Sequence, residues 1–307
     1  MVDFQGLLQR IAEVSLYLCI GFAGRRVRFF NEETNRVISK LIMYLFLPFF
    51  LVSSFVHAEY TMGIREMLRI ILFATLWQIS MLLLARGVAS VLSKDQYERG
   101  NYSFLLGFGN IGIFGLPLIQ PLFGSAGMMV GMLFNVPFNA LSCSVGLCLI
   151  RGGKRPEKLW KMVFSAPFAG VLIGMLLFLL KIHLPAFAKN AVMQIGTMCL
   201  PMMMISVGVT LADARWKEIL SNSKTLLVVL IKLLVFPCFI WAAMLFITKD
   251  PILRGVSVAL TAMPCAGLAT TMNILYGRHE KEASAAVFLS TIMSLITVPF
   301  ITWHLLM

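Results

Sequence analysis

Runs of apolar residues, each long enough to cross a lipid bilayer, follow one another along the chain, and polar residues gather between them. A helix that crosses the hydrocarbon core needs about 20 mostly apolar residues. Ten such runs are present, at residues 5–23, 34–57, 66–91, 97–123, 126–150, 159–181, 186–212, 222–247, 252–276 and 281–305. They are continuous, whereas the strands of a membrane barrel alternate between apolar and polar residues. The pattern predicts an all-α integral membrane protein with ten transmembrane helices.

Composition agrees with this prediction and excludes several other classes of protein. Of the 307 residues, 59% are hydrophobic and 13% are charged, and the mean hydropathy is +0.87. Soluble domains have about 45–50% apolar and about 25% charged residues. An ordinary soluble enzyme, a disordered chain and a coiled coil are therefore excluded. All six cysteines lie inside apolar runs without metal-ligand spacing, so we expect free thiols and no cofactor or metal.

The distribution of lysine and arginine predicts an orientation in the membrane. Eighteen of the 26 lie on the side that holds the connections after the first, third, fifth, seventh and ninth runs, seven lie on the other side, and Lys232 lies within a run. The positive-inside rule places the richer side in the cytoplasm. Both termini then face the outer, periplasmic side of the cell (inner) membrane, and the first run is expected to be a retained span. Orientation explains the net charge of +12, so we expect no nucleic-acid partner.

The two halves of the chain share features that predict an internal repeat. The longest polar connection, residues 151–161, leaves five runs on each side. Because five is odd, the second half must insert upside down relative to the first. The second and seventh runs share Leu-Pro at Pro48 and Pro201, and the fourth and ninth begin with Arg-Gly. Inverted repeats of this kind build many secondary transporters. We therefore predict two five-helix repeats, 1–150 and 162–307, joined by a cytoplasmic linker.

Two of the runs carry too many helix breakers to be continuous helices. Residues 107–124 read GFGNIGIFGLPLIQPLFG, and residues 262–273 read AMPCAGLATTMN. Backbone groups freed by a break inside the membrane must face protein or a watery cavity. Half-helix N-termini in such a cavity favour an anion. The alternative is that these Gly and Pro residues only allow close packing and kinks, but two breaks in matching positions favour a substrate site where they meet.

Polar residues near the breaks are the candidates for binding a small polar substrate. Asn135 and Asn139 lie one helical turn apart and share a face. The amides serve either the substrate or the freed backbone, and the sequence leaves both roles open. The candidate substrate-binding residues are Asn110, Gly112, Pro117, Asn135, Asn139, Pro264, Thr270, Thr271 and Asn273.

One charged residue, Lys232, lies near the middle of the eighth run. An ionisable group at that depth is a functional hypothesis by default. It either pairs with a substrate carboxylate or exchanges a proton. The alternative is a lysine that snorkels to the interface or bonds the carbonyls of a broken helix. No cluster of intramembrane carboxylates marks a sodium site, so the coupling ion, H⁺ or Na⁺, stays open.

The segment Asn110-Ile-Gly112, followed by Gly115-Leu-Pro117-Leu118, resembles the fourth-helix motif of the auxin efflux carrier family, which includes plant PIN-type exporters and bacterial permeases. The resemblance covers the whole chain, although only this motif is specific. It implies a fold related to the bile-acid symporters, with runs 1, 2, 6 and 7 as a scaffold. Runs 3–5 and 8–10 would form a moving bundle in which the two broken helices cross, and homodimers would form through the scaffold. Bacterial relatives are assigned to malonate, malate or similar anions; without the long cytoplasmic loop of long plant members, auxin is not the expected substrate.

The function predicted from these features is secondary active transport of a small organic anion, such as a dicarboxylate, by alternating access. No nucleotide-binding loop is present, so an ion gradient or the substrate's own gradient would supply the energy. The alternatives are a non-transporting scaffold or sensor, a channel, and a carrier for another class, such as sodium-coupled bile-acid-like anions. An enzyme is not expected, because the four histidines are scattered and no catalytic motif is present.

Overall fold

The structure is a computed structural model that describes residues 4–56, 63–153, 166–180, 182, 184–213 and 223–306. Within these ranges every regular element is helical, and the one β-type pairing is an isolated bridge between Gly109 and Cys265. The first half contains α1 (Phe4–Arg26), α2 (Glu32–Leu41), α3 (Leu47–Val56), α4 (Ile64–Leu92), α5 (Gln96–Gly107), α6 (Leu116–Leu141) and α7 (Leu147–Ile150). The second half contains α9 (Ala166–Leu179), α10 (Ala186–Thr197), α11 (Cys199–Ala212), α13 (Ser223–Leu230), α14 (Phe236–Ile247), α15 (Pro251–Thr261), α16 (Leu268–Tyr276) and α17 (Glu280–Leu306).

Four single turns of π-helix lead into α-helices in the described ranges, and the sequence did not predict them. They are η1 (Ile42–Phe46), η2 (Ile111–Gly115), η3 (Ser142–Gly146) and η4 (Ile231–Val235). A π-turn inside an α-helix is rare and is frequently found at functional sites. Here η2 lies within the first predicted break, and η4 contains Lys232.

Six helical segments among the described residues are long and apolar enough to cross a membrane. They are Glu32–Ser53, Ile64–Leu92, Leu122–Ile150, Ala186–Ala212, Ser223–Ile247 and Glu280–His304. The predicted fourth and ninth spans fall short because irregular backbone divides each of them into short pieces, such as the nine-residue α16. The all-helical, multi-pass character is thus confirmed, while the count of ten spans and their inverted symmetry stay predictions.

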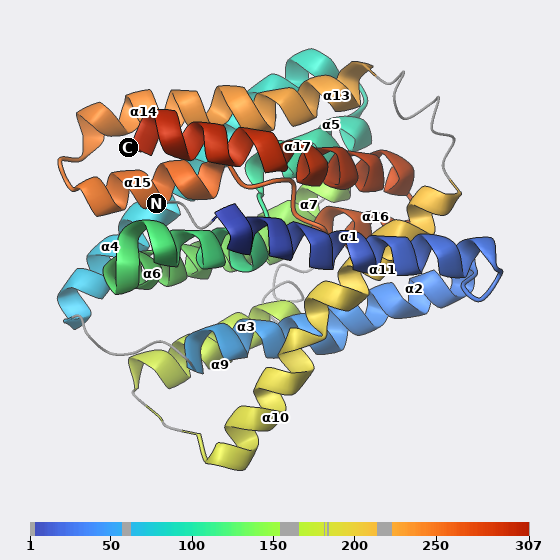
Figure 1. The fold of residues 1–307 in the computed structure, drawn as a ribbon, viewed down its shortest axis with the longest axis horizontal. Coiled ribbons are helices and arrows are strands. Elements are labelled where there is room, and N and C mark those ends of the chain that lie inside the picture. The colour runs from blue at the N-terminus through green and yellow to red at the C-terminus, as the bar shows by residue number, and fades with distance from the viewer. Residues whose placement is uncertain are drawn as a thin grey trace.

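The helices pack as two groups. The first helix group contains α1, α2, α3, α9, α10 and α11; the second contains α4–α7 and α13–α17. In Figure 1, α3, α9 and α10 lie along one edge of the molecule and α13, α14 and α17 along the opposite edge. The two groups meet where α2 and α11 contact α16 and α17, and where α6 contacts α9.

Both interrupted segments begin in the same way. The Asp95 carboxylate accepts hydrogen bonds from the main-chain N–H groups of Tyr97 and Glu98 and caps α5, while the Asp250 carboxylate caps α15. Such caps satisfy donors that the first helical turn leaves free. Each cap is followed by the Arg-Gly pair noted in the sequence, so the two interrupted segments begin with the same local structure.

Candidate functional site

The two broken helices cross at their breaks, and each break satisfies main-chain groups that the other leaves free. The Asn110 N–H donates to the Pro264 carbonyl at 2.7 Å, and the Ala266 N–H donates to the Phe108 carbonyl at 3.2 Å. From α17, the Ser290 hydroxyl accepts from the Cys265 N–H at 3.0 Å. This exchange replaces hydrogen bonds that lipid cannot supply. The segments 108–110 and 264–266 therefore form a short antiparallel crossing, which we call the crossover.

A small cavity of about 40 Å³ lies against the crossover, on the boundary between the two helix groups. Its volume is close to the roughly 30 Å³ share of one water molecule. The second helix group contributes the crossover and one face of α6, and the first contributes parts of α3 and α11. The lining residues are Leu47, Phe50, Gly109, Asn110, Ile111, Gly112, Asn135, Phe138, Asn139, Cys199, Met203, Ala266, Gly267 and Leu268.

Three buried amides face this crossover cavity, and they differ in their partners. The Asn110 side chain, 7% exposed, forms no hydrogen bond with the described residues. Asn135 is 4% exposed, and its buried Nδ2 has no partner among them. The Nδ2 of Asn139 donates to the Asn135 carbonyl at 2.7 Å. A buried amide donor without a partner is energetically costly, so the unpaired Asn135 Nδ2 is suited to a ligand.

The other candidate residues take three different places. Gly112 lines the cavity, where an added Cβ would lie 3.0 Å from the Phe50 ring. Pro264 belongs to the crossover through its carbonyl. Pro117 lies in the first turn of α6, and its side chain is outside the described part of the chain.

Three candidates on α16 do not line the cavity. Thr270 accepts a hydrogen bond from the Ser284 hydroxyl at 3.3 Å, and Asn273 donates from Nδ2 to Asn101 Oδ1 at 2.9 Å. The buried Thr271 hydroxyl has no partner among the described residues. Thr270 and Asn273 instead hold α16 against α17 and α5.

Lys232 lies beside the crossover. Its side chain is only 1% exposed, so the ammonium group does not snorkel to the surface of the protein. A Cβ added to Gly109 would lie 3.4 Å from Lys232 Nζ, and Gly109 also lines the cavity. The described residues form no ion pair with Lys232, although ion pairs such as Arg25–Asp213 and Lys224–Glu98 occur elsewhere among them. The structure thus places a lysine amine without a carboxylate partner among the described residues next to the crossover.

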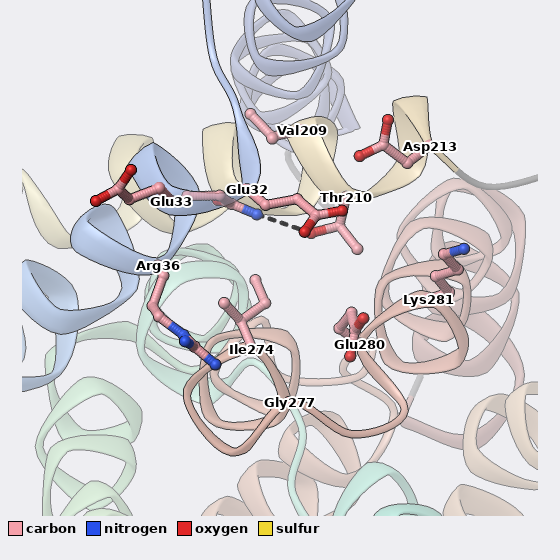
Figure 2. Close-up of a pocket in the computed structure, with 11 residues that line it drawn as sticks. Glu32, Glu33, Arg36, Val209, Thr210, Asp213, Ile274, Gly277, Glu280 and Lys281 are labelled. Carbon is pink, nitrogen blue, oxygen red and sulfur yellow. Dashed lines mark hydrogen bonds between the residues drawn. The ribbon is translucent and has the colours of Figure 1, made fainter.

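A second cavity, of about 560 Å³, opens on the same boundary between the helix groups, at the helix ends predicted to be cytoplasmic. Figure 2 shows charged side chains of α2, the C-terminal end of α11 and the start of α17 around it, among them Arg36, Asp213 and Lys281. Neutral polar residues lie at its inner end, where Asn35 Nδ2 donates to Thr210 Oγ1 at 3.1 Å. The Ser206 hydroxyl donates to Asn35 Oδ1 at 2.8 Å.

The sequence analysis missed these polar residues between α2 and α11, as well as Asn101 and Ser290. Each is a single small polar residue in an apolar run, which by pattern alone does not differ from an ordinary serine or threonine bonded to its own helix. The one signal was Asn35, an amide near the start of the second run.

Comparisons with known proteins point to membrane transport. The sequence profile of the family described as "Membrane transport protein" matches residues 7–159 and 155–302. A protein of Methanothermobacter thermautotrophicus described as an uncharacterized transporter is 22% identical over 298 residues, which cover 96% of this chain and 97% of the relative. An uncharacterized transporter of Methanocaldococcus jannaschii is 20% identical over 302 residues, with 95% and 97% covered.

Proposed function

Because the chain belongs to the membrane transport protein family, we propose that it is a secondary carrier of a small organic anion that works by alternating access at the crossover. Its membership confirms the resemblance to auxin efflux carriers, and its broader role as a multi-pass membrane transporter is established by the same match. The substrate class, the mechanism and the site residues are the proposal.

The observation that carries the proposal is the set of donors at the crossover cavity. Asn135 offers an unpaired, buried Nδ2, and the ammonium of Lys232 lies beside Gly109 on the crossover. The described lining residues of the cavity carry no carboxylate that would repel an anion. Hydrogen-bond donors and one positive charge suit a carboxylate group. A cavity of about 40 Å³ must widen to hold even a small dicarboxylate, which fits a carrier that opens and closes.

A stripe of residues on α11 supports a route from the cytoplasmic end to the site. Met203 lines the crossover cavity, Thr210 and Asp213 line the larger cavity, and Ser206 lies between them. These positions are three or four residues apart, so they share one face of the helix. Met203 and Thr210 are separated by about 10 Å along the axis. The second helix group would move along this face and open the crossover to one side at a time.

Alternating access also agrees with the expected architecture. We propose that residues 1–150 and 162–307 form the two inverted five-helix repeats, joined by residues 151–161, and that the first helix group is the scaffold through which homodimers form. The shared Asp caps of α5 and α15 support a common origin of the two interrupted segments.

The test is uptake of radiolabelled malonate and malate into proteoliposomes, with proton and sodium gradients imposed in turn. We expect saturable uptake that Asn110→Ala and Pro117→Ala abolish while both variants still insert into the membrane. Normal uptake by both variants would remove the crossover from the mechanism. Binding without uptake would indicate a sensor, and flux far above carrier turnover would indicate a channel.

A further inference from the structure

The buried ammonium of Lys232 needs a compensating charge that the described part of the protein does not provide. Lys232 lies in η4, within the apolar segment Ser223–Ile247, and is among the largest fully buried side chains. A charged group in such a place is expensive and normally pairs with an acid or with main-chain carbonyls. No described hydrogen bond or ion pair reaches its Nζ.

The ionisable groups on the neighbouring helices lie too far away to neutralise it. The turn η4 packs against α5, α13, α14 and α17. On α13 the charge is Lys224, about 12 Å along the helix from Lys232, and it binds Glu98 of α5 at 3.2 Å. The Tyr102 hydroxyl of α5 also donates to Glu98, so it belongs to the same group of side chains as the Lys224–Glu98 pair and not to the surroundings of Lys232. The remaining ionisable residues of these helices lie at helix ends or at the outer surface: Arg99, Tyr97, Cys238, Glu280, Lys281, Glu282 and His304.

Beyond those helices, the crossover contributes one ionisable neighbour of Lys232, the thiol of Cys265. The thiol is neutral when protonated and is itself fully buried. The nearest place for a compensating anion is therefore the crossover cavity, because Gly109 borders both the cavity and the ammonium.

We propose that Lys232 is the proton-coupling group of the carrier, protonated while the crossover cavity holds an anion and neutral when the cavity is empty. This inference rests on the proposed function and identifies H⁺ as the coupling ion. When the anion leaves, the ammonium transfers one proton to water on the side to which the cavity is open and becomes a neutral amine. Anion binding from that side reverses the transfer. A monoanion then moves with one proton and no net charge, and a dianion moves with one net negative charge.

Thermodynamic linkage makes the coupling reciprocal. If the protonated amine strengthens anion binding, the bound anion strengthens proton binding by the same factor. Arginine at this position keeps the positive charge but does not release a proton in this pH range. Methionine keeps the length and removes the charge. Comparing the two variants therefore separates the effect of the positive charge from the effect of proton release.

The experiment compares Lys232→Arg and Lys232→Met with the wild-type protein in proteoliposomes, using radiolabelled malonate, malate, lactate and acetate as the probes. Counterflow, the exchange of labelled for unlabelled anion without a proton gradient, reports on the carrier cycle. Accumulation driven by an inward proton gradient, with a pH-sensitive dye trapped inside, reports on coupling. Lys224→Arg, in a surface ion pair, is the matched control and should behave as the wild type.

We expect wild-type accumulation to be accompanied by internal acidification. Lys232→Arg should retain counterflow and lose accumulation by about tenfold or more, and Lys232→Met should weaken anion affinity by a similar factor. Accumulation by Lys232→Arg equal to the wild type, or wild-type accumulation driven only by sodium, would overturn the coupling role and leave the carrier intact. Absence of counterflow in the wild-type protein for every anion would overturn the proposed function and this inference together. Elution as a monodisperse peak, checked for each variant, separates these outcomes from misfolding.

Discussion

At the scale of single residues, two buried asparagines differ in whether their side-chain nitrogen has a partner. Asn135 keeps an unpaired Nδ2 at the crossover cavity, whereas Asn273 uses its Nδ2 to hold Asn101 and the Ala269 carbonyl. An unsatisfied buried donor costs about 1–3 kcal/mol. Asn135→Leu should therefore leave the unfolding temperature unchanged or higher and abolish anion uptake. Asn273→Leu should lower the unfolding temperature and preserve anion affinity.

The measurement is thermal unfolding in detergent together with uptake in proteoliposomes, for both variants in parallel. Loss of stability in Asn135→Leu with normal uptake would assign that amide to the protein's own structure.

His279, in the turn between α16 and α17, gives the protein a pH-dependent contact outside the membrane. Its Nδ1 lies 3.8 Å from Glu282 Oε1, and pairing with this carboxylate raises the pKa of His279. A raised folded-state pKa means that the stabilisation is complete below the unfolded pKa of about 6.5 and is lost as pH rises through the folded value. The pair is partly exposed, so its contribution is below about 1 kcal/mol.

His279→Asn should remove this pH dependence, and asparagine tolerates the positive φ of 46° at this position. Unfolding temperatures measured from about pH 6 to about pH 8.5 should fall more steeply in the wild type than in the variant. Parallel curves would show that His279 and Glu282 do not interact in solution.

The sequence predicted part of this site and could not predict the rest. Four predicted residues share the cavity. Asn110 and Gly112 lie within the first break, and Asn135 and Asn139 lie one turn apart on α6. The polar residues of α16 were expected there too, but the second break ends at Gly267 and turns that face toward α5 and α17. The direction of a helix after a break depends on tertiary packing and leaves no signal in local sequence.

At the scale of elements, glycine sets how closely the helices of the first group approach. A Cβ added to Gly208 would lie 2.1 Å from the Leu18 carbonyl oxygen, and one added to Gly21 would lie 2.1 Å from that of Ile205. Small residues permit such close contact between membrane helices. The density of Gly and Pro predicted both broken helices, whereas the π-turns depend on packing and were not predicted.

Gly208→Ala should force α1 and α11 apart and destabilise the protein by about 1–3 kcal/mol. Gly87→Ala on α4 is the matched control, because nothing lies within 4 Å of a Cβ there. Alanine has the higher helix propensity, so the control should unfold at the same or a higher temperature. An unchanged unfolding temperature in Gly208→Ala would mean that the two helices separate without cost.

At the scale of the whole molecule, the open question is whether the interrupted segments cross the bilayer. Length and hydropathy alone identify six spans among the described residues, whereas the apolar runs of the sequence predict ten, a count that the charge asymmetry supports. The two counts differ at the first, fourth, sixth and ninth runs. The ninth contains α15 and α16, which together occupy Pro251–Tyr276 around the second break. If this segment crosses, Lys249 and Arg278 lie on opposite sides of the membrane; if it does not, they lie on the same side.

Both residues are exposed. Cysteine labelling of Lys249→Cys and Arg278→Cys, each in a background without the six native cysteines, therefore shows on which side of the membrane each position lies. The positive-inside rule predicts that the cysteine at 249 reacts with a membrane-impermeant maleimide in intact cells. The cysteine at 278 should react only after permeabilisation, as should Lys94→Cys in the exposed turn between α4 and α5. Labelling of 249 and 278 from one side would contradict a crossing by the ninth segment. The same result would contradict alternating access at the crossover, because a segment that does not cross the membrane cannot expose an anion to each side in turn.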